Sequence, residues 1–247
     1  MNLSKSKVNR YALLRHKKYR EREGLFLVQG AKAVKDTVGK FEPETFIVRN
    51  GCNFDFLRGF ENVVEANEAD FRKISTLENM PEIIAVYKFP ENKDNTLEVR
   101  NDSFVLVLDG VQDPGNLGTI VRTAHWFGVN RIFCSKDTVD LFNPKVVLST
   151  MGSIANVDVT YCNLPELFDV NPNLPVYALL LEGENLFEVS SLPAGFIVMG
   201  SEGHGPSETT LGYVTKALTI PAAHPDNSPD SLNVAVATAI TLSQFIK

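Results

Sequence analysis

The stretch from Phe104 to Ala124, FVLVLDGVQDPGNLGTIVRTA, contains an apolar strand-like run, a glycine-containing turn and part of a helix. Two shorter segments share its glycine and asparagine content and also border apolar runs: Gly200 to Gly205 (GSEGHG) and Ser231 to Val234 (SLNV). In an open α/β sheet, ligands bind in the loops that follow the strands. The three segments therefore predict one site assembled from distant parts of the chain, as is typical of an enzyme.

Apolar runs and helical patterns alternate along the second part of the chain. Strands are expected at residues 104–108, 131–134, 157–161, 176–181, 196–199 and 217–220, and helices at 117–127, 144–150 and 232–246. Strands that alternate with helices pair in parallel and are covered on both faces. This part of the chain is therefore predicted to be an α/β domain with a mostly parallel sheet.

The first part of the chain has the pattern of a smaller α/β domain. Helices are expected at residues 6–23, 31–38 and 70–76, and strands at 25–28, 45–48, 62–66 and 83–87. The polar stretch from Phe89 to Ser103 lacks a sustained apolar face and is typical of a linker. We therefore predict a domain at 1–90, a linker at 91–103 and a second domain at 104–247.

Charge is distributed unevenly along the 247 residues. The net charge is −6, but residues 1–24 alone carry eight lysines or arginines against two glutamates. Cations can pair with phosphate, and interleaved aromatic rings can stack on bases. We therefore expect RNA contacts near the N-terminus, although a solvated helix face is the alternative; the candidate residues are Arg15, Lys17, Lys18, Tyr19 and Arg20.

Composition argues against several other classes of protein. No apolar run approaches the roughly 20 residues that span a bilayer, and the N-terminus lacks the apolar stretch of a signal peptide, so we expect no membrane partner and a cytoplasmic location. The cysteines and histidines lack the spacing of metal ligands, so no metal site is expected. These residues are Cys52, Cys134, Cys162, His125, His204 and His224.

Together the segments resemble the motifs of the SpoU/TrmH family of RNA ribose methyltransferases, within the SPOUT class. N-x(5)-R-[TS]-A corresponds to Asn116–Ala124, G-S-E-G-x-G to Gly200–Gly205, and I-P followed by S-L-N-V to Ile220-Pro221 and Ser231–Val234. The resemblance implies a C-terminal trefoil knot and a homodimer through the C-terminal domain that completes the site. It places the segment Lys145–Gly152 near that site or the dimer interface.

The opening residues are similar to the small substrate-binding domain that many members carry, which resembles RNA-binding ribosomal proteins. Gln29 departs from that pattern, because most relatives have an acidic residue there. A second departure lies in the third methyltransferase motif, where the loop Ala222–Asp230 between Ile220-Pro221 and Ser231 is longer than the corresponding loop of relatives. The change at Gln29 puts an acid-specific function of that position in doubt. The extra length of the loop leaves its contacts undefined by the resemblance.

The activity implied is methylation of a ribose 2′-hydroxyl in structured RNA with S-adenosylmethionine as the methyl donor, on ribosomal RNA first and transfer RNA second. A noncatalytic RNA-binding protein of the same fold and a related base methyltransferase are the alternatives. By resemblance the catalytic residues are Asn116, Arg122, Glu202, Ser231 and Asn233, and the cofactor-binding residues are Met199, Gly200, Gly203, Ile220 and Leu232. The glycine spacings are not G-x-G-x-x-G, which disfavours a dinucleotide site.

Arg122 has more than one possible function. The family resemblance suggests a general base acting on the 2′-hydroxyl, but a guanidinium has a pKa above about 12 and normally stays charged. A cation that positions a phosphate beside the hydroxyl is the second possibility. A surface arginine paired with Asp109 or Asp113 is the structural alternative.

Overall fold

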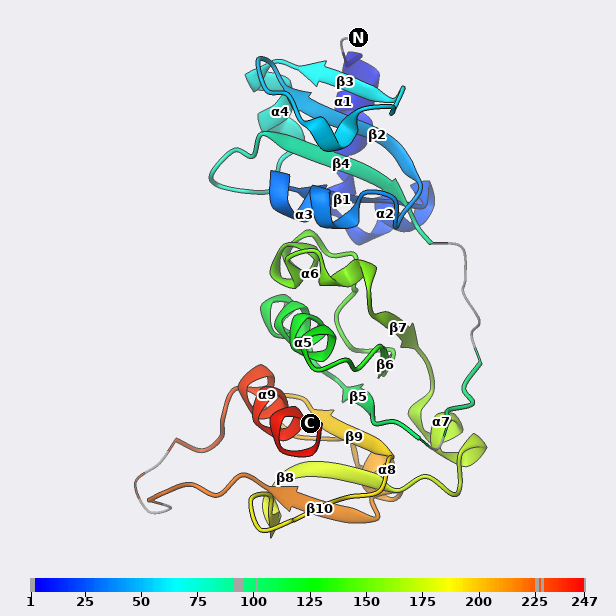
Figure 1. Ribbon diagram of the computed structural model, residues 1–247, viewed down its shortest axis with the longest axis vertical. Helices are drawn as coiled ribbons and strands as arrows, with labels where there is room; N and C mark the ends of the chain where they lie inside the picture. The colour runs from blue at the N-terminus through cyan, green and yellow to red at the C-terminus, as the bar shows by residue number, and fades with distance from the viewer. Residues whose placement is uncertain (1–2, 91–95, 101, 225–226, 228, 247) are drawn as a thin grey trace. The chain divides into compact units, whose positions relative to one another are not determined.

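The computed structural model describes residues 3–90, 96–100, 102–224, 227 and 229–246 (Figure 1). Its contacts divide the chain into two compact units. The N-terminal unit comprises Met1–Lys93 and Asp140–Ala155, and the C-terminal unit comprises Asp94–Val139 and Asn156–Lys247. The segment Asp140–Ala155 is thus grouped with the N-terminal residues, whereas the sequence analysis had placed it in the second domain.

The N-terminal unit is built on a four-stranded sheet with the order β1-β4-β2-β3, in which only β2 and β3 are parallel. Its strands are β1 (Leu25–Gln29), β2 (Pro43–Arg49), β3 (Val63–Ala66) and β4 (Ile83–Lys88). Its α-helices are α1 (Lys5–Ala12), α2 (Lys17–Glu23), α3 (Ala31–Thr37), α4 (Glu68–Ile74) and α6 (Pro144–Thr150), with short 3₁₀ turns at Leu13–Arg15, Asp55–Leu57 and Ser153–Ala155. α1 and α4 pack their apolar faces against the sheet to form the core.

The helix expected at residues 6–23 is broken in the middle, where His16 has extended backbone angles (φ −101°, ψ 132°). Arg20 explains how the break is stabilised: its guanidinium donates hydrogen bonds to the carbonyl oxygens of Leu14 (2.9 Å) and Arg15 (3.1 Å). The same group lies 2.5 Å from the carboxylate of Asp140 and is only 2% exposed. Arg20 therefore does not fit the RNA contact predicted for it, because its charge is already paired inside the unit.

Aromatic packing and a close backbone approach attach the segment Asp140–Ala155 to this unit. The ring of Phe142 stacks on Phe89 with centroids 4.6 Å apart, and it lies equally close to Phe26. Gly152 adopts φ +90°, and a Cβ atom there would lie 2.7 Å from the Cβ of Asp36. The core of the N-terminal unit is therefore completed by residues that come much later in the sequence.

The C-terminal unit contains a six-stranded, entirely parallel sheet, which confirms the predicted α/β architecture. The strand order is β10-β8-β9-β5-β6-β7. The strands are β5 (Val105–Asp109), β6 (Arg131–Cys134), β7 (Asp158–Tyr161), β8 (Val176–Asn185), β9 (Phe196–Gly200) and β10 (Lys216–Thr219). The helices are α5 (Pro114–Trp126), α7 (Leu164–Val170), α8 (Glu208–Leu211) and α9 (Val234–Phe245).

Strand order reverses between β5 and β9, both of which are buried along their whole length. From β5 the chain proceeds outward through β6 and β7, whereas β9, β8 and β10 lie on the other side. Asp109 at the end of β5 pairs with Gly200 at the end of β9. Ligands of open parallel sheets bind at such a switch point, beyond the carboxyl ends of the strands. The loops carrying the first two motifs begin there.

Part of the predicted linker is fixed to the C-terminal unit. The guanidinium of Arg131 donates hydrogen bonds to the carbonyl oxygens of Thr96 and Glu98. The side-chain amide of Asn171 donates to the carbonyl of Leu97 (2.8 Å) and accepts from the backbone N–H of Val99 (2.9 Å). Leu97 and Val99 also pack against the core. Residues 96–100 are therefore part of the folded unit, while residues 91–95 and 101 of the predicted linker lie outside the described residues.

Arg20→Ala should destabilise the N-terminal unit by about 3 kcal/mol, because it removes one partner of a buried ion pair and two hydrogen bonds to carbonyls. Urea unfolding of the full chain, followed by circular dichroism, measures the loss. Arg58→Ala is the matched control, since Arg58 and its partner Asp55 are 84% and 85% exposed and such a pair contributes about 0–1 kcal/mol. Equal effects of the two substitutions would contradict a structural function for Arg20.

Candidate active site

The first motif begins inside a helix. Asp113 caps α5 by accepting a hydrogen bond from the backbone N–H of Asn116 (2.9 Å), and Pro114 occupies the first helical position, where its missing N–H costs nothing. The sequence analysis expected the helix to start at residue 117, which would leave Asn116 in the preceding loop. This residue lies instead in the first turn, and because Asp113 provides the cap, the amide of Asn116 is available for other contacts.

The second motif forms a closed loop at the end of β9. Ser201 and Gly205 exchange two backbone hydrogen bonds of 3.0 Å, which bring the chain back on itself. A Cβ atom on Gly200 would lie 2.1 Å from Gly205 C and Pro206 N. Glycine is therefore required at position 200 for the chain to return, whereas the sequence analysis had named Gly200 only as a cofactor-binding residue. Glu202 and Gly203 lie exposed at the tip.

The third motif caps the last helix. Asn233 accepts hydrogen bonds from the backbone N–H groups of Ala235 (2.9 Å) and Val236 (3.3 Å) at the start of α9. Its amide nitrogen donates to Oδ1 of Asn116 (2.9 Å). The amide nitrogen of Asn116 in turn donates to Oε1 of Glu202 (2.6 Å). We call these three side chains the amide relay; they join one residue from each motif.

The direction of the amide relay follows from hydrogen-bond chemistry. The cap occupies the amide oxygen of Asn233, so only its NH₂ group can face Asn116. Asn116 must then present its oxygen to Asn233 and its NH₂ group to Glu202. The carboxylate of Glu202 is thus the accepting end, and this side chain is exposed at the edge of the sheet. The arrangement can orient a carboxylate for contact with a ligand.

Two predicted catalytic residues are not joined to the amide relay. Arg122 is exposed on α5, and its side chain forms no hydrogen bond or ion pair with the residues that the structure describes. The alternative pairing with Asp109 or Asp113 is thus not seen: Asp109 accepts two hydrogen bonds from Ser207, and Asp113 accepts one from the backbone of Asn116. Ser231 is exposed in the loop before α9, and Asn233 rather than Ser231 caps the helix.

The predicted cofactor residues differ in their accessibility. Leu232 is 50% exposed, and Gly203 has open space around it. Ile220 is partly buried and packs against a core cluster that includes Tyr177 and Leu186. The side chain of Met199 is 2% exposed, so only its backbone can reach a ligand. Leu232 and the tip of the second-motif loop at Gly203 are therefore the surfaces best placed to contact a cofactor at the carboxyl edge of the parallel sheet.

Four of the five predicted RNA contacts retain an exposed or partly exposed side chain. Lys18 is exposed, and Lys17 is exposed beside Glu21, 3.8 Å away. Tyr19 is partly buried, with a neighbouring guanidinium 4.8 Å from its ring centroid. Arg15 is exposed, but it donates hydrogen bonds to the carbonyl oxygens of Ala12 and Lys73. Lys17, Lys18 and Tyr19 therefore remain the main candidates.

Sequence analysis missed Asp109, Asp113 and Ser207 as parts of the site. Asp113 had a recognisable signal, because an aspartate followed by proline is a common start of a helix. Ser207 had a weaker one, since serine three residues before Thr210 fits a helix cap. Asp109 had no recognisable signal in the sequence, because its partner Ser207 lies 98 positions further along the chain.

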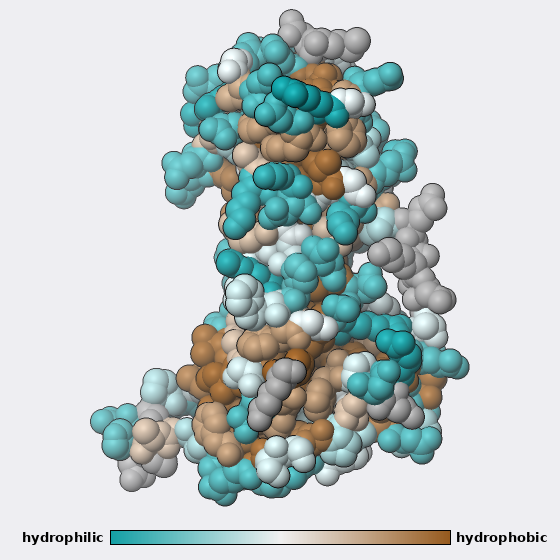
Figure 2. Space-filling view, viewed as in Figure 1, coloured by the Kyte–Doolittle hydropathy of each residue, from teal (hydrophilic) through white to brown (hydrophobic). Residues whose placement is uncertain are grey.

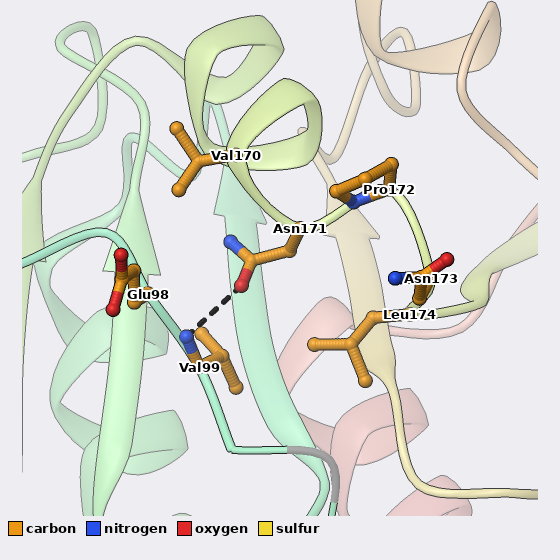
Figure 3. Close-up of a pocket in the computed structure, with 7 residues that line it drawn as sticks. All are labelled: Glu98, Val99, Val170, Asn171, Pro172, Asn173 and Leu174. Carbon is orange, nitrogen blue, oxygen red and sulfur yellow. Dashed lines mark hydrogen bonds between the residues drawn. The ribbon is translucent and has the colours of Figure 1, made fainter.

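A cavity of about 230 Å³ lies elsewhere in the C-terminal unit, where residues 98–99 run beside the end of α7 (Figure 3). It is lined by Glu98, Val99, Val170, Asn171, Pro172, Asn173 and Leu174, none of which was a predicted site residue. The dashed line in Figure 3 is the bond from Val99 to Asn171 that fixes the linker. Among the described residues there is also no metal-binding cluster and no helix able to cross a membrane.

Two family models match the chain. The SpoU rRNA Methylase family matches residues 103–243, and the MRM3-like substrate binding domain matches residues 5–85. The 23S rRNA (guanosine(2553)-2′-O)-methyltransferase RlmP of Bacillus subtilis (strain 168) is 30% identical over 240 residues, which cover 95% of this chain and 93% of RlmP.

Solved structures agree with these matches. A structure described as a putative RNA methyltransferase of the TrmH family from Porphyromonas gingivalis superposes with a TM-score of 0.85 at 36% identity, covering 99% of this chain and 98% of that one. An AdoMet-bound rRNA methyltransferase from Sinorhizobium meliloti superposes with a TM-score of 0.84 at 25% identity, covering 99% and 95%.

Asn233→Asp should break the amide relay and leave the helix cap in place. A carboxylate still accepts from the N–H groups of α9, but it cannot donate to Asn116. The side-chain NH₂ resonances of Asn116 in a ¹⁵N-correlated NMR spectrum should therefore shift, while the thermal midpoint stays within about 2 °C of the wild type, since surface changes rarely exceed about 0.5 kcal/mol. Unchanged Asn116 resonances would refute the relay.

Proposed function

Because this chain belongs to the SpoU rRNA methylase family, we propose that the edge of its parallel sheet methylates a ribose 2′-hydroxyl of ribosomal RNA. The observation that carries the proposal is the amide relay, which joins all three motifs at the switch point. The names of the relatives, which are 23S rRNA methyltransferases, favour ribosomal over transfer RNA as the substrate.

S-adenosylmethionine is the methyl donor of this family, and one similar rRNA methyltransferase has been solved with AdoMet bound. The residues present at the edge fit such a ligand. The closed loop exposes backbone groups around Gly203, and Leu232 offers an apolar surface. Backbone amides and carbonyls can recognise the edges of an adenine, and an apolar wall can cover its face. The donor supplies an electrophilic methyl group, and the protein aligns it with the ribose.

The chemistry requires removal of the hydroxyl proton and alignment of the ribose. Within the amide relay, Glu202 is the only group that can accept a hydrogen bond from that hydroxyl through a charged oxygen, and the two asparagines fix its orientation. We assign Arg122 to the phosphate beside the ribose. Its exposed guanidinium suits this function, because it has the fork of donors that matches phosphate oxygens.

The N-terminal residues are proposed to bind the folded RNA. The match to a substrate-binding domain at residues 5–85 supports this function, and the exposed side chains of Lys17, Lys18 and Tyr19 can pair with phosphate and stack on bases. Arg15 can add charge at this surface, whereas buried Arg20 cannot. We retain 1–90 and 104–247 as the functional domains, joined by the segment 91–103, because the two family models divide the chain at nearly the same place. Within that joining segment, residues 96–100 pack on the C-terminal unit.

The fold of the second domain is proposed to include a trefoil knot of its C-terminal segment, as in the SPOUT class. The packing of α9 against α5 and β9 is compatible with that path of the chain. A cytoplasmic location stays a prediction, supported by ribosomal RNA as the proposed substrate.

A homodimer through this domain is proposed from the surface of its helices. Apolar residues are distributed around α9 rather than confined to one stripe, which is typical of a helix that is buried on more than one side. In the single chain, however, Val236 of α9 is 49% exposed and Trp126 at the end of α5 is 85% exposed. Figure 2 shows hydrophobic residues gathered over α9. A second copy would cover them and bring its own Arg122 close to the interface.

Arg122→Ala should reduce methyl transfer at least about 100-fold, because misplacing the ribose costs that much. RNA affinity should change little, since one phosphate contact is lost among several. The assay transfers labelled methyl from S-adenosylmethionine to unmodified ribosomal and transfer RNA, with digestion to nucleosides.

Two matched variants sharpen this experiment. Thr119→Ala, on the exposed side of the same helix, should retain activity. Arg122→Lys keeps the positive charge but lacks the planar set of guanidinium donors, so its rate of methyl transfer should lie between those of Arg122→Ala and Thr119→Ala. Label on a base would contradict ribose methylation, and full activity of Arg122→Ala would contradict the function assigned to Arg122. RNA binding by the wild type without any methyl transfer would favour a noncatalytic protein.

Val236→Asp should convert a dimer to a monomer, because a charge on an apolar surface that a partner covers is costly to bury. Light scattering after size-exclusion chromatography should give twice the chain mass of 27.3 kDa for the wild type and once that mass for the variant. Leu181→Asp, at a residue that is 74% exposed on β8, is the control and should stay dimeric. A monomeric wild type would refute the dimer.

A further inference from the structure

Asp109 is a buried carboxylate at the switch point that no motif of the site includes. It ends β5, is 6% exposed, and lies in register with Gly200 of the neighbouring strand β9. Burial of a carboxylate is costly unless hydrogen bonds compensate for the lost water. The contacts of Asp109 therefore indicate what the buried charge stabilises.

Ser207 supplies those contacts twice. Its backbone N–H and its hydroxyl both donate to Oδ2 of Asp109, each at 2.8 Å. The hydroxyl has one proton, and the carboxylate is a closer and stronger acceptor than the hydroxyls of Thr209 (3.0 Å) and Thr210 (3.1 Å). The oxygen of Ser207 is then free to accept from the backbone N–H of Thr210 and cap α8.

Asp109 thereby holds both ends of the second-motif loop. Backbone pairing with β5 fixes the loop at Gly200, and the Asp109 carboxylate fixes it at Ser207. Between these ends the chain closes through Ser201 and Gly205, and Glu202 reaches Asn116. A shift of Ser207 would therefore move the loop tip relative to the first motif.

We propose that Asp109 is a positioning residue, which holds Ser207 so that the loop Gly200–Ser207 binds S-adenosylmethionine and presents Glu202 to the ribose. This inference rests on the proposed function of the site. Asp109 itself acts through Ser207 and has no direct contact with the reacting atoms.

The test compares variants of the full chain by calorimetric titration with S-adenosylmethionine alone, by methyl transfer to RNA, and by thermal unfolding. Ser207→Ala removes the hydroxyl and should weaken cofactor binding about tenfold, the effect of losing a hydrogen bond to a charged group. Ser207→Thr keeps the hydroxyl and should bind within about twofold of the wild type. Thr209→Ala is the matched control on α8, because it removes a hydroxyl that contacts Ser207 but leaves both hydrogen bonds from Ser207 to Asp109 in place.

A double-mutant cycle separates positioning from simple stabilisation. Asp109→Asn combined with Ser207→Ala should weaken cofactor binding by less than the product of the two single effects, because both remove the same anchor. A lower thermal midpoint of Ser207→Ala with unchanged cofactor affinity would overturn the proposal, as would independent single effects. A wild type that binds the cofactor without methylating RNA would contradict the proposed function. The cofactor affinities of the variants would still test whether Asp109 positions Ser207.

Discussion

The parallel pairing of β5 with β9 is the interaction on which the site depends. These two strands are buried along their whole length, and their register sets Asp109 opposite Gly200. Because parallel strands release their following loops at the same edge, this register brings together motifs that are about 90 residues apart in the sequence. The absence of a side chain at Gly200 then lets the second loop return beside its own start, which sets the position of Glu202.

Hydrogen-bond chemistry converts that register into a directed site. The cap of α9 uses the oxygen of Asn233, which forces every following amide to donate toward Glu202. The result is a carboxylate, that of Glu202, whose orientation is fixed by two neutral asparagine amides. Arg122 lies outside this network within the described residues, so the single chain provides an acceptor and a separate exposed cation. The proposed homodimer would give a physical reason for this separation, since a partner can bring a second cation to an interface.

The N-terminal unit illustrates how tertiary structure changes the meaning of a charge. Eight cations near the N-terminus suggested RNA contacts that include Arg20, but Arg20 lies inside, where it donates to carbonyl oxygens at the helix break and pairs with Asp140. No local signal distinguishes it from Lys18, because the partner lies 120 positions away. The polar composition of residues 96–100 likewise predicted a free linker, although Leu97 and Val99 pack into a core.

The sequence by itself determined the order of the elements, the parallel α/β class and the three motif loops. Apolar runs and helix signals are local, so β6 and α6 were predicted with the bounds that the structure has. It did not predict α7 and α8, the break at His16, the first turn of α5 or the buried side chain of Met199. Only the tertiary structure decided which polar groups meet, as Asp109 meets Ser207 and Asn116 meets both Glu202 and Asn233. The physical reason is that burial and hydrogen-bond partners depend on contacts between distant residues, which no local pattern encodes.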